Sequence, residues 1–267
     1  MQRIFHTPEG VRDIYSQECS RKQKLQEKLH RVFHQYGFED IETPTFEYFE
    51  VFSKEVGTIP SRELYKFFDR EGNTLVLRPD FTPSVSRACA TYFNPEREVV
   101  SLCYTGNTFI NNSSFRGRLK ETTQMGVERM GDDSPEADAE ILAMTVECLL
   151  ATGLTEFQVS VGQVDYYKAI FAQTGMSQEE EEELRELISQ KNYFGVEELV
   201  KNKNMDKSLA RVLSQLPQMF GSTEVLEKAK SLTDNPQALK AVARLEEIYE
   251  LLKVYGYEKY VTFDFAM

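Results

Sequence analysis

The stretch that decides the fold reads CYTGNTFINN at residues 103–112, and QMGVE follows it at residues 124–128. With their flanks, these segments predict a hairpin with strands at about 99–110 and 119–130. On this evidence alone the hairpin could belong to an unrelated fold, with Ile110 as an ordinary strand residue.

A helix and an edge strand are expected near the N-terminus. Residues 16–36 show helical periodicity, with Ser16 as the N-cap and Gly37 as the end of the helix. A strand should follow at 38–44 and lie at a sheet edge, because it ends at Pro44, which cannot donate to a ladder. The expected buried stripe of the helix consists of Leu25, Leu29, Val32, Phe33 and Tyr36.

A smaller hairpin and a second helix come next. Residues 65–68 and 74–77 flank a turn-forming DREGN segment, which is a good hairpin signal. Thr82 followed by Pro83 has the pattern of an N-cap and a first helical residue, so a helix should run from there to about Tyr92.

The order of elements predicts the fold class. Ser134 and Pro135 begin another helix, which Gly153 ends, and alternation at 157–161 indicates a strand. Helix, several strands, helix and strand in this order predict an α+β fold with a mainly antiparallel sheet flanked by helices.

The composition changes between residues 175 and 235, where strand signals vanish and charge-rich helical periodicity takes over. We interpret 175–235 as a helical insertion. Residues 1–174 and 236–267 would form the core, to which the chain returns through a long helix and a strand at 260–265.

Composition and charge narrow the function classes. The formal net charge of −12 opposes binding of a polyanion over a broad face, so nucleic acid is an unlikely main partner. The first residues carry no apolar signal region, and the longest apolar run, 141–150, is too short to span a bilayer. We therefore expect a cytoplasmic protein that does not enter a membrane.

Cysteine and histidine spacing predicts no metal site. The four cysteines form no CxxC pair, so reduced and mostly buried thiols are expected. His30 and His34 lie one helical turn apart and could share a metal, but no third ligand is near them in the sequence. We interpret the two histidines as a solvated flank of the helix.

Four segments, in their order and spacing, resemble the catalytic core of the histidyl-tRNA synthetases over essentially the whole chain. They are PEGVRD at 8–13, YGFEDIETP at 36–44, LRPDFT at 77–82, and the hairpin between Gly106 and Glu128. The resemblance implies a class II aminoacyl-tRNA synthetase-like core.

The chain departs from the synthetases where they hold ATP. The family pattern has an arginine where Ile110 stands and a glutamate where Asn112 stands. A guanidinium on the α-phosphate makes hydrogen bonds worth roughly 1.5–3 kcal/mol each, and loss of one preorganised donor slows a reaction by about 10²–10³-fold. Synthetases also carry Glu-Gly-Thr where this chain has Asp80-Phe81-Thr82, whereas its catalytically inactive paralogues carry Asp-Phe-Thr-Pro.

This resemblance implies a site for histidine rather than a catalytic centre. Asp80, Thr82, Gln124 and Glu128 match the residues that hold histidine in the synthetases. Two carboxylates can accept hydrogen bonds from an ammonium or an imidazole N–H, and Thr and Gln add neutral bonds that fix orientation. The alternative is that these polar groups only satisfy one another.

Three basic residues lie within the matched segments. Arg118 and Lys120 match positions that contact nucleotide phosphates, so weak anion binding is possible there, as is an exposed basic loop. Arg78 precedes a proline and is expected to pair with a carboxylate.

The inactive paralogues imply the partners. They serve as regulatory subunits of ATP phosphoribosyltransferase, the first enzyme of histidine biosynthesis, so the implied partner is the short-form catalytic subunit and the implied effector is histidine, with no cofactor. The segment 16–44 matches the family's dimer interface, which implies a homodimer within a hetero-oligomer. The family's paired-tyrosine motif would lie beyond Met267, so we expect the histidine pocket of this chain to lack a wall.

Two rival functions remain open from the sequence. The chain could be the catalytic-core fragment of a true histidyl-tRNA synthetase. It could also be a histidine-binding module with no phosphoribosyltransferase partner.

Overall fold

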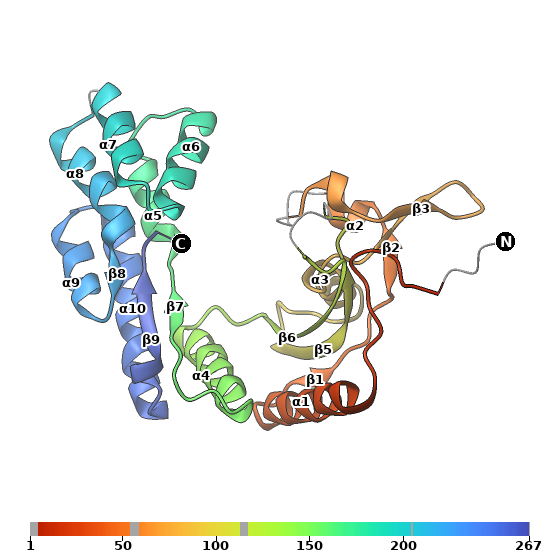
Figure 1. The fold of residues 1–267 in the computed structure, drawn as a ribbon. Helices are drawn as coiled ribbons and strands as arrows, with labels where there is room; N and C mark the ends of the chain where they lie inside the picture. Colours follow the sequence, from red (N-terminus) through yellow and green to blue (C-terminus); the bar gives the residue numbers. More distant parts are fainter. Residues whose placement is uncertain (1–4, 54–58, 113–116, 204, 267) are drawn as a thin grey trace. The chain divides into compact units, whose positions relative to one another are not determined.

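The structure, a computed structural model, describes residues 5–53, 59–112, 117–203 and 205–266. The chain divides into two compact units, residues 1–132 and residues 133–267 (Figure 1). The sequence-predicted insertion, 175–235, lies within the second unit together with the helices and strands around it. The division into a core and an insertion stays a prediction.

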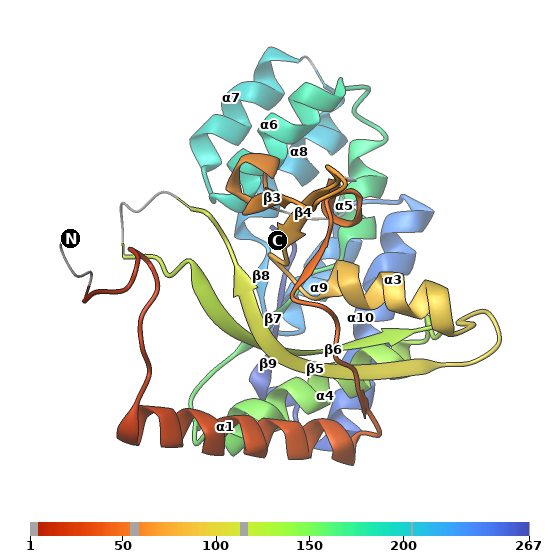
Figure 2. The same cartoon turned by 90° about the vertical axis from the view of Figure 1, so that its right-hand side faces the viewer.

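The first unit is a pair of small sheets with one long helix and two shorter ones. In order it contains α1 (Ser16–Gln35), β1 (Glu39–Asp40), β2 (Phe46–Tyr48), α2 (Glu50–Ser53), β3 (Lys66–Phe68), β4 (Thr74–Leu77), α3 (Thr82–Tyr92), β5 (Val100–Phe109) and β6 (Glu121–Met130). The sheets have the strand orders β1-β5-β6 and β2-β4-β3. Figure 2 shows the long β5–β6 hairpin running above α1. Every pairing in these sheets is antiparallel except β1 with β5.

The core of the first unit lies between α3 and β5. The Phe81 and Tyr104 rings stack with centroids 4.3 Å apart and planes within 7°. Close packing of this kind leaves no space for extra atoms, and a Cβ added to Gly126 would lie 2.4 Å from the Tyr104 hydroxyl. The buried cluster around the stack consists of Phe81, Val85, Cys89, Val100, Leu102 and Tyr104.

The predicted hairpins and helices of this unit are confirmed, and two predicted caps are wrong. α1 begins after Tyr15, so Ser16 is its first residue and not its N-cap, with an unusual positive φ of 50°. α3 has Phe81 in the N-cap position, because the Thr82 hydroxyl bonds to Glu128 instead of capping. Of the stripe expected on α1, only Val32 and Phe33 are buried.

The second unit is mainly helical. It contains α4 (Pro135–Ala151), β7 (Val159–Val161), α5 (Val164–Phe171), α6 (Gln178–Ser189), α7 (Tyr193–Asn202), α8 (Lys207–Gln215), β8 (Phe220–Gly221), α9 (Glu224–Ser231), α10 (Pro236–Tyr255) and β9 (Val261–Asp264). Ser134 caps α4 as predicted, accepting a bond from the Ala137 N–H. Strand β8 corrects the expectation that 175–235 holds only helices, since it pairs with β9 in the sheet β7-β9-β8. Two residues are too few for a strand period to show in a sequence.

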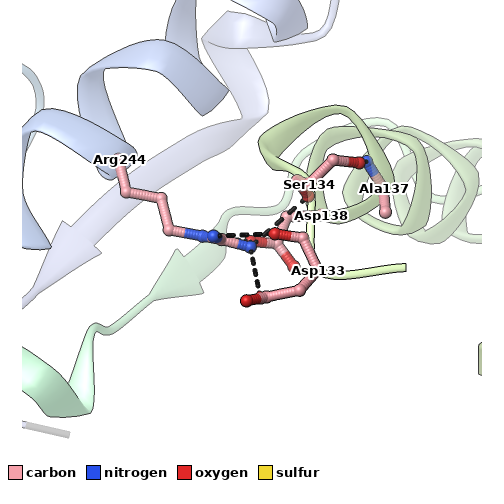
Figure 3. Close-up of polar contacts among 5 residues, drawn as sticks. All are labelled: Asp133, Ser134, Ala137, Asp138 and Arg244. Atoms are coloured by element: carbon pink, nitrogen blue, oxygen red, sulfur yellow. Dashed lines mark hydrogen bonds and ion pairs between the residues drawn. The ribbon is translucent and has the colours of Figure 1, made fainter. Parts of the chain in front are cut away.

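Arg244 joins α10 to the start of α4, as Figure 3 shows. Its Nε donates to Asp138 Oδ2 at 2.9 Å, and its Nη1 donates to the Asp133 carbonyl at 3.1 Å. The planar guanidinium can hold these partners together in a way that a lysine ammonium cannot.

Within the described residues, every helix is too short or too polar to cross a lipid bilayer.

We predict that Arg244→Lys lowers the free energy of unfolding by about 1 kcal/mol. A lysine keeps the positive charge but cannot donate to Asp138 and to the Asp133 carbonyl at the same time, as the planar guanidinium does. Chemical denaturation monitored by circular dichroism measures this change. Lys253→Arg on the same helix is the control, since Lys253 makes an exposed pair with Glu250, and such pairs contribute little. An equal effect of the two substitutions would contradict the prediction.

Candidate functional site

The β5–β6 hairpin and the start of α3 bring the four predicted histidine-site residues together. In the ladder Gly106 pairs with Gln124, and Leu102 pairs with Glu128. Side chains two residues apart point to the same face of a strand, so Gln124 and Glu128 lie on the face that packs against α3. Asp80 and Thr82 reach that face from the turn that begins α3.

Two direct hydrogen bonds link these four side chains. The Thr82 hydroxyl donates to Glu128 Oε1 at 2.6 Å, and Gln124 Nε2 donates to Asp80 Oδ1 at 3.0 Å. The Phe81 N–H also donates to Asp80 Oδ1, at 2.7 Å. All four side chains are half-buried. The polar side chains of the site are therefore held in place by bonds to one another and to the backbone.

Sequence reasoning missed Tyr104, which belongs to the same group. Its hydroxyl donates to Glu128 Oε1 at 3.4 Å, and burial raises its pKa, with the nearby Glu128 and Asp80 charges adding to the effect. In the sequence, Tyr104 reads as an ordinary aromatic strand residue. Its position two residues before Gly106, on the inward face of the hairpin, is the signal that could have found it.

The electrostatics of the site favour a positively charged ligand. Burial raises the pKa of the Glu128 carboxyl above its ordinary value of 4.5, and the Asp80 charge raises it further, while bonds from Thr82 and Tyr104 lower it. A desolvated carboxylate next to a second one is costly unless a cation approaches. An ammonium group placed between the two would remove that cost.

Arg78 differs from its expectation. Among the described residues its guanidinium bonds to backbone carbonyls and not to a carboxylate: its Nε donates to the Asn107 carbonyl at 2.9 Å and its Nη1 to the Thr43 carbonyl at 2.8 Å. Its guanidinium lies 4.0 Å from the centre of the Phe81 ring. Burial lowers the pKa of Arg78, and these carbonyls take up donors that would otherwise be unsatisfied. Arg78 thus holds the β5 strand and not a ligand.

The antiparallel pairing of the hairpin continues past β5, where the uncharged Ile110 and Asn112 lie. The Ile110 N–H donates to the Lys120 carbonyl at 2.9 Å, which continues the pairing beyond the end of β5. The Asn112 amide donates to the Leu119 carbonyl at 3.4 Å. Ile110 offers no hydrogen-bond donor from its side chain, so the phosphate-gripping arginine has no substitute at that position.

The two predicted anion-contact residues lie outside the polar group around Glu128. Arg118 is exposed and Lys120 is half-buried, and both precede β6. Four residues of extended chain, roughly 13 Å, separate Lys120 from Gln124. The tip of the hairpin, residues 113–116, lies outside the described residues.

A helix start packed on a long antiparallel hairpin, with polar side chains between them, is the arrangement expected of a class II aminoacyl-tRNA synthetase-like protein. The chain belongs to the histidyl-tRNA synthetase family and, within it, to the group whose members are named ATP phosphoribosyltransferase regulatory subunit. The family model described as histidyl-tRNA synthetase matches residues 10–267.

Individual relatives support this assignment. The ATP phosphoribosyltransferase regulatory subunit of Acetivibrio thermocellus is 40% identical over 98% of the chain, and the chain spans 63% of the length of that relative. The subunit of the same name from Thermoanaerobacter pseudethanolicus is 38% identical over 99% of the chain, which spans 68% of its length. A solved structure from Bacillus halodurans, described as an ATP phosphoribosyltransferase regulatory subunit/histidyl-tRNA synthetase, superposes with a TM-score of 0.90 and 32% identity over 100% of this chain and 69% of that one.

We predict that Glu128→Gln raises the stability of the ligand-free protein at pH 8 and has little effect at pH 4. The pKa of Glu128 is higher in the folded protein than its ordinary value of 4.5, so ionisation of this carboxyl destabilises the folded state. The protein loses this stability as the pH rises through the folded-state pKa of Glu128, and none of it is lost below pH 4.5. Gln keeps an acceptor for the Thr82 and Tyr104 hydroxyls and carries no charge.

Urea denaturation of both proteins at the two pH values measures the difference. Glu156→Gln, which removes a charge from an exposed loop, is the matched control. A Glu128→Gln protein that is less stable than the wild type at pH 8 would contradict the electrostatic account.

Proposed function

We propose that this chain is the synthetase-like part of a non-catalytic regulatory subunit, which binds and activates the short-form catalytic ATP phosphoribosyltransferase and senses histidine. Its curated relatives carry the name of that subunit. The proposal covers a cytoplasmic location and a homodimer inside a hetero-oligomer.

One contrast within the hairpin supports the proposal most strongly. The polar group of Asp80, Thr82, Gln124 and Glu128 is intact, whereas Ile110 and Asn112 stand where the synthetases carry charged ATP-contacting residues. A site that keeps its amino-acid end and loses its nucleotide end can recognise histidine and cannot adenylate it efficiently.

Histidine suits the retained end chemically. Its ammonium can donate to the Asp80 and Glu128 carboxylates, and the desolvation that raises the Glu128 pKa strengthens the response to a bound cation. Its imidazole can exchange a further hydrogen bond with the Gln124 or Tyr104 side chain.

Feedback by histidine needs differential binding. Histidine can inhibit the catalytic subunit through this chain only if it binds the inhibited assembly more tightly than the active one. Bound histidine then shifts the equilibrium toward the inhibited assembly by the same factor. The polar group lies at the contact of α3 with the β5–β6 hairpin, so occupation of the pocket can alter how these two elements pack.

The exposed face of α1 supports the proposed homodimer. Leu25 is 40% exposed, and Leu29 and Tyr36 are half-buried, whereas Val32 and Phe33 are buried. Apolar side chains that stay partly accessible in one chain can be covered by a second copy at a subunit interface.

We predict that the full-length protein increases phosphoribosyl-ATP formation by the short catalytic subunit, and that histidine reverses the increase. Glu128→Gln should keep the activation and weaken inhibition by roughly tenfold or more, because a charge-assisted bond of about 1.5–3 kcal/mol is lost. Measuring the rate against histidine concentration for the two proteins, with Glu156→Gln as the control, tests this. No activation by the wild-type protein would leave only the rival functions.

We predict that the full-length protein does not catalyse histidine-dependent exchange of pyrophosphate into ATP, because Ile110 cannot stabilise the charge that grows on the α-phosphate. A histidyl-tRNA synthetase assayed in parallel is the positive control. Exchange at a rate within about tenfold of that enzyme would favour the synthetase-fragment function instead.

A further inference from the structure

Four metal-binding side chains converge on one point in the first unit, away from the polar group around Glu128. His30 and His34 lie one turn apart on α1, Asp40 lies on β1, and Cys103 lies on β5. Their ligand atoms all lie within 4.8 Å of one another.

The fold explains why residues so far apart in the sequence meet. β1 pairs with β5 in parallel, and this register sets Asp40 beside Cys103. Residues four apart on a helix share a face, so α1, which packs against β5, presents both imidazoles on one side. No third metal ligand is near His30 and His34 in the sequence, but strand pairing brings a third, Asp40, and a fourth, Cys103, beside them.

Contacts within the cluster centre on Asp40. His30 Nε2 lies 2.5 Å from Asp40 Oδ1, and His34 Nε2 lies 2.9 Å from Asp40 Oδ2. Cys103 Sγ lies 3.5 Å from Asp40 Oδ1. Both imidazoles therefore direct Nε2 at the Asp40 carboxylate, each at a different oxygen, and the thiol approaches the same carboxylate from the protein interior, where Cys103 is buried.

We propose a structural zinc site that joins α1 to β1 and β5, with four ligands: His30, His34, Asp40 and Cys103.

The donor set and its spacing fit zinc. Two imidazole nitrogens, a thiolate and a carboxylate oxygen are ligands that Zn²⁺ accepts in tetrahedral geometry. With bonds of about 2.0–2.1 Å to nitrogen and about 2.3 Å to sulfur, donor atoms around the ion stand roughly 3.3–3.8 Å apart. The contacts to Asp40, at 2.5, 2.9 and 3.5 Å, are of this size or shorter, and all the donor atoms lie within 4.8 Å of one another, so changes in spacing of about 1 Å or less would admit the ion.

Charge also favours a dication here, because Asp40 supplies a carboxylate beside the two imidazoles. Zinc binding would break the Cys103 S–H bond, form a Zn–S bond and release the proton to solvent. The half-exposed His30 and His34 rings, 39% and 46% accessible, leave a path for the ion from solvent.

The test is a cobalt and zinc titration of the full chain without a polyhistidine tag, after removal of metals with a chelator. One Co²⁺ per chain should bind with tetrahedral d–d absorption and a thiolate charge-transfer band. Zn²⁺ should displace the cobalt and raise the thermal midpoint. Cys103→Ser should remove the charge-transfer band, and His34→Gln should weaken binding by at least about tenfold.

The chain offers matched controls for both ligand types. His6→Ala removes the third histidine, and Cys148→Ser removes a half-buried free thiol; neither should change metal binding. Because Cys103 is fully buried, His34→Gln, at an exposed position, repeats the test without disturbing the core. Binding well below one ion per chain in the wild type would overturn the proposal. Equally, metal binding unchanged in His34→Gln and Cys103→Ser would overturn it.

Discussion

Stacking of the Phe81 ring on the Tyr104 ring holds α3 against the β5–β6 hairpin, and the candidate site exists because of this contact. The stack fixes the turn in which Asp80 and Thr82 lie, directly above the strand that carries Gln124 and Glu128. Glycines at 106 and 126 permit the approach, since a Cβ at Gly106 would lie 2.7 Å from the Phe81 ring. Aromatic packing therefore positions the polar group, and the Tyr104 hydroxyl also contributes to it through its bond to Glu128.

The same packing makes the charged form of Glu128 unfavourable at a position where a bound cation could stabilise it. Glu128 is desolvated by the same packing that orients it, and its pKa is raised because water no longer stabilises its charge. Proteins commonly lose some stability at binding sites in this way. In this chain the charge differs along the hairpin, with the Glu128 carboxylate, close to Asp80, on one part and the uncharged Ile110 just past the end of β5.

The two units carry different features. The first unit holds the polar group around Glu128 and the α1 helix, on which the proposals of histidine sensing and of a homodimer rest. The second unit is built from helices around α10, and Arg244 ties that helix to the start of α4.

Local sequence patterns predicted the long helices and the two hairpins but not the short elements β2, α2 and β8, and sequence motifs identified the family and placed Ile110 where the synthetases carry an arginine. Helix starts such as Ser134-Pro135 and turns such as that between β3 and β4 depend on neighbouring residues, so they can be read locally. Asp80, Thr82, Gln124 and Glu128 were found through their match to a family motif. Only the tertiary structure decided that Thr82 bonds to Glu128 instead of capping α3, and that Tyr104 joins the pocket. It also brought Asp40 and Cys103, 63 residues apart, beside the two histidines of α1. Such meetings depend on strand pairing and register between distant segments, which local periodicity does not encode.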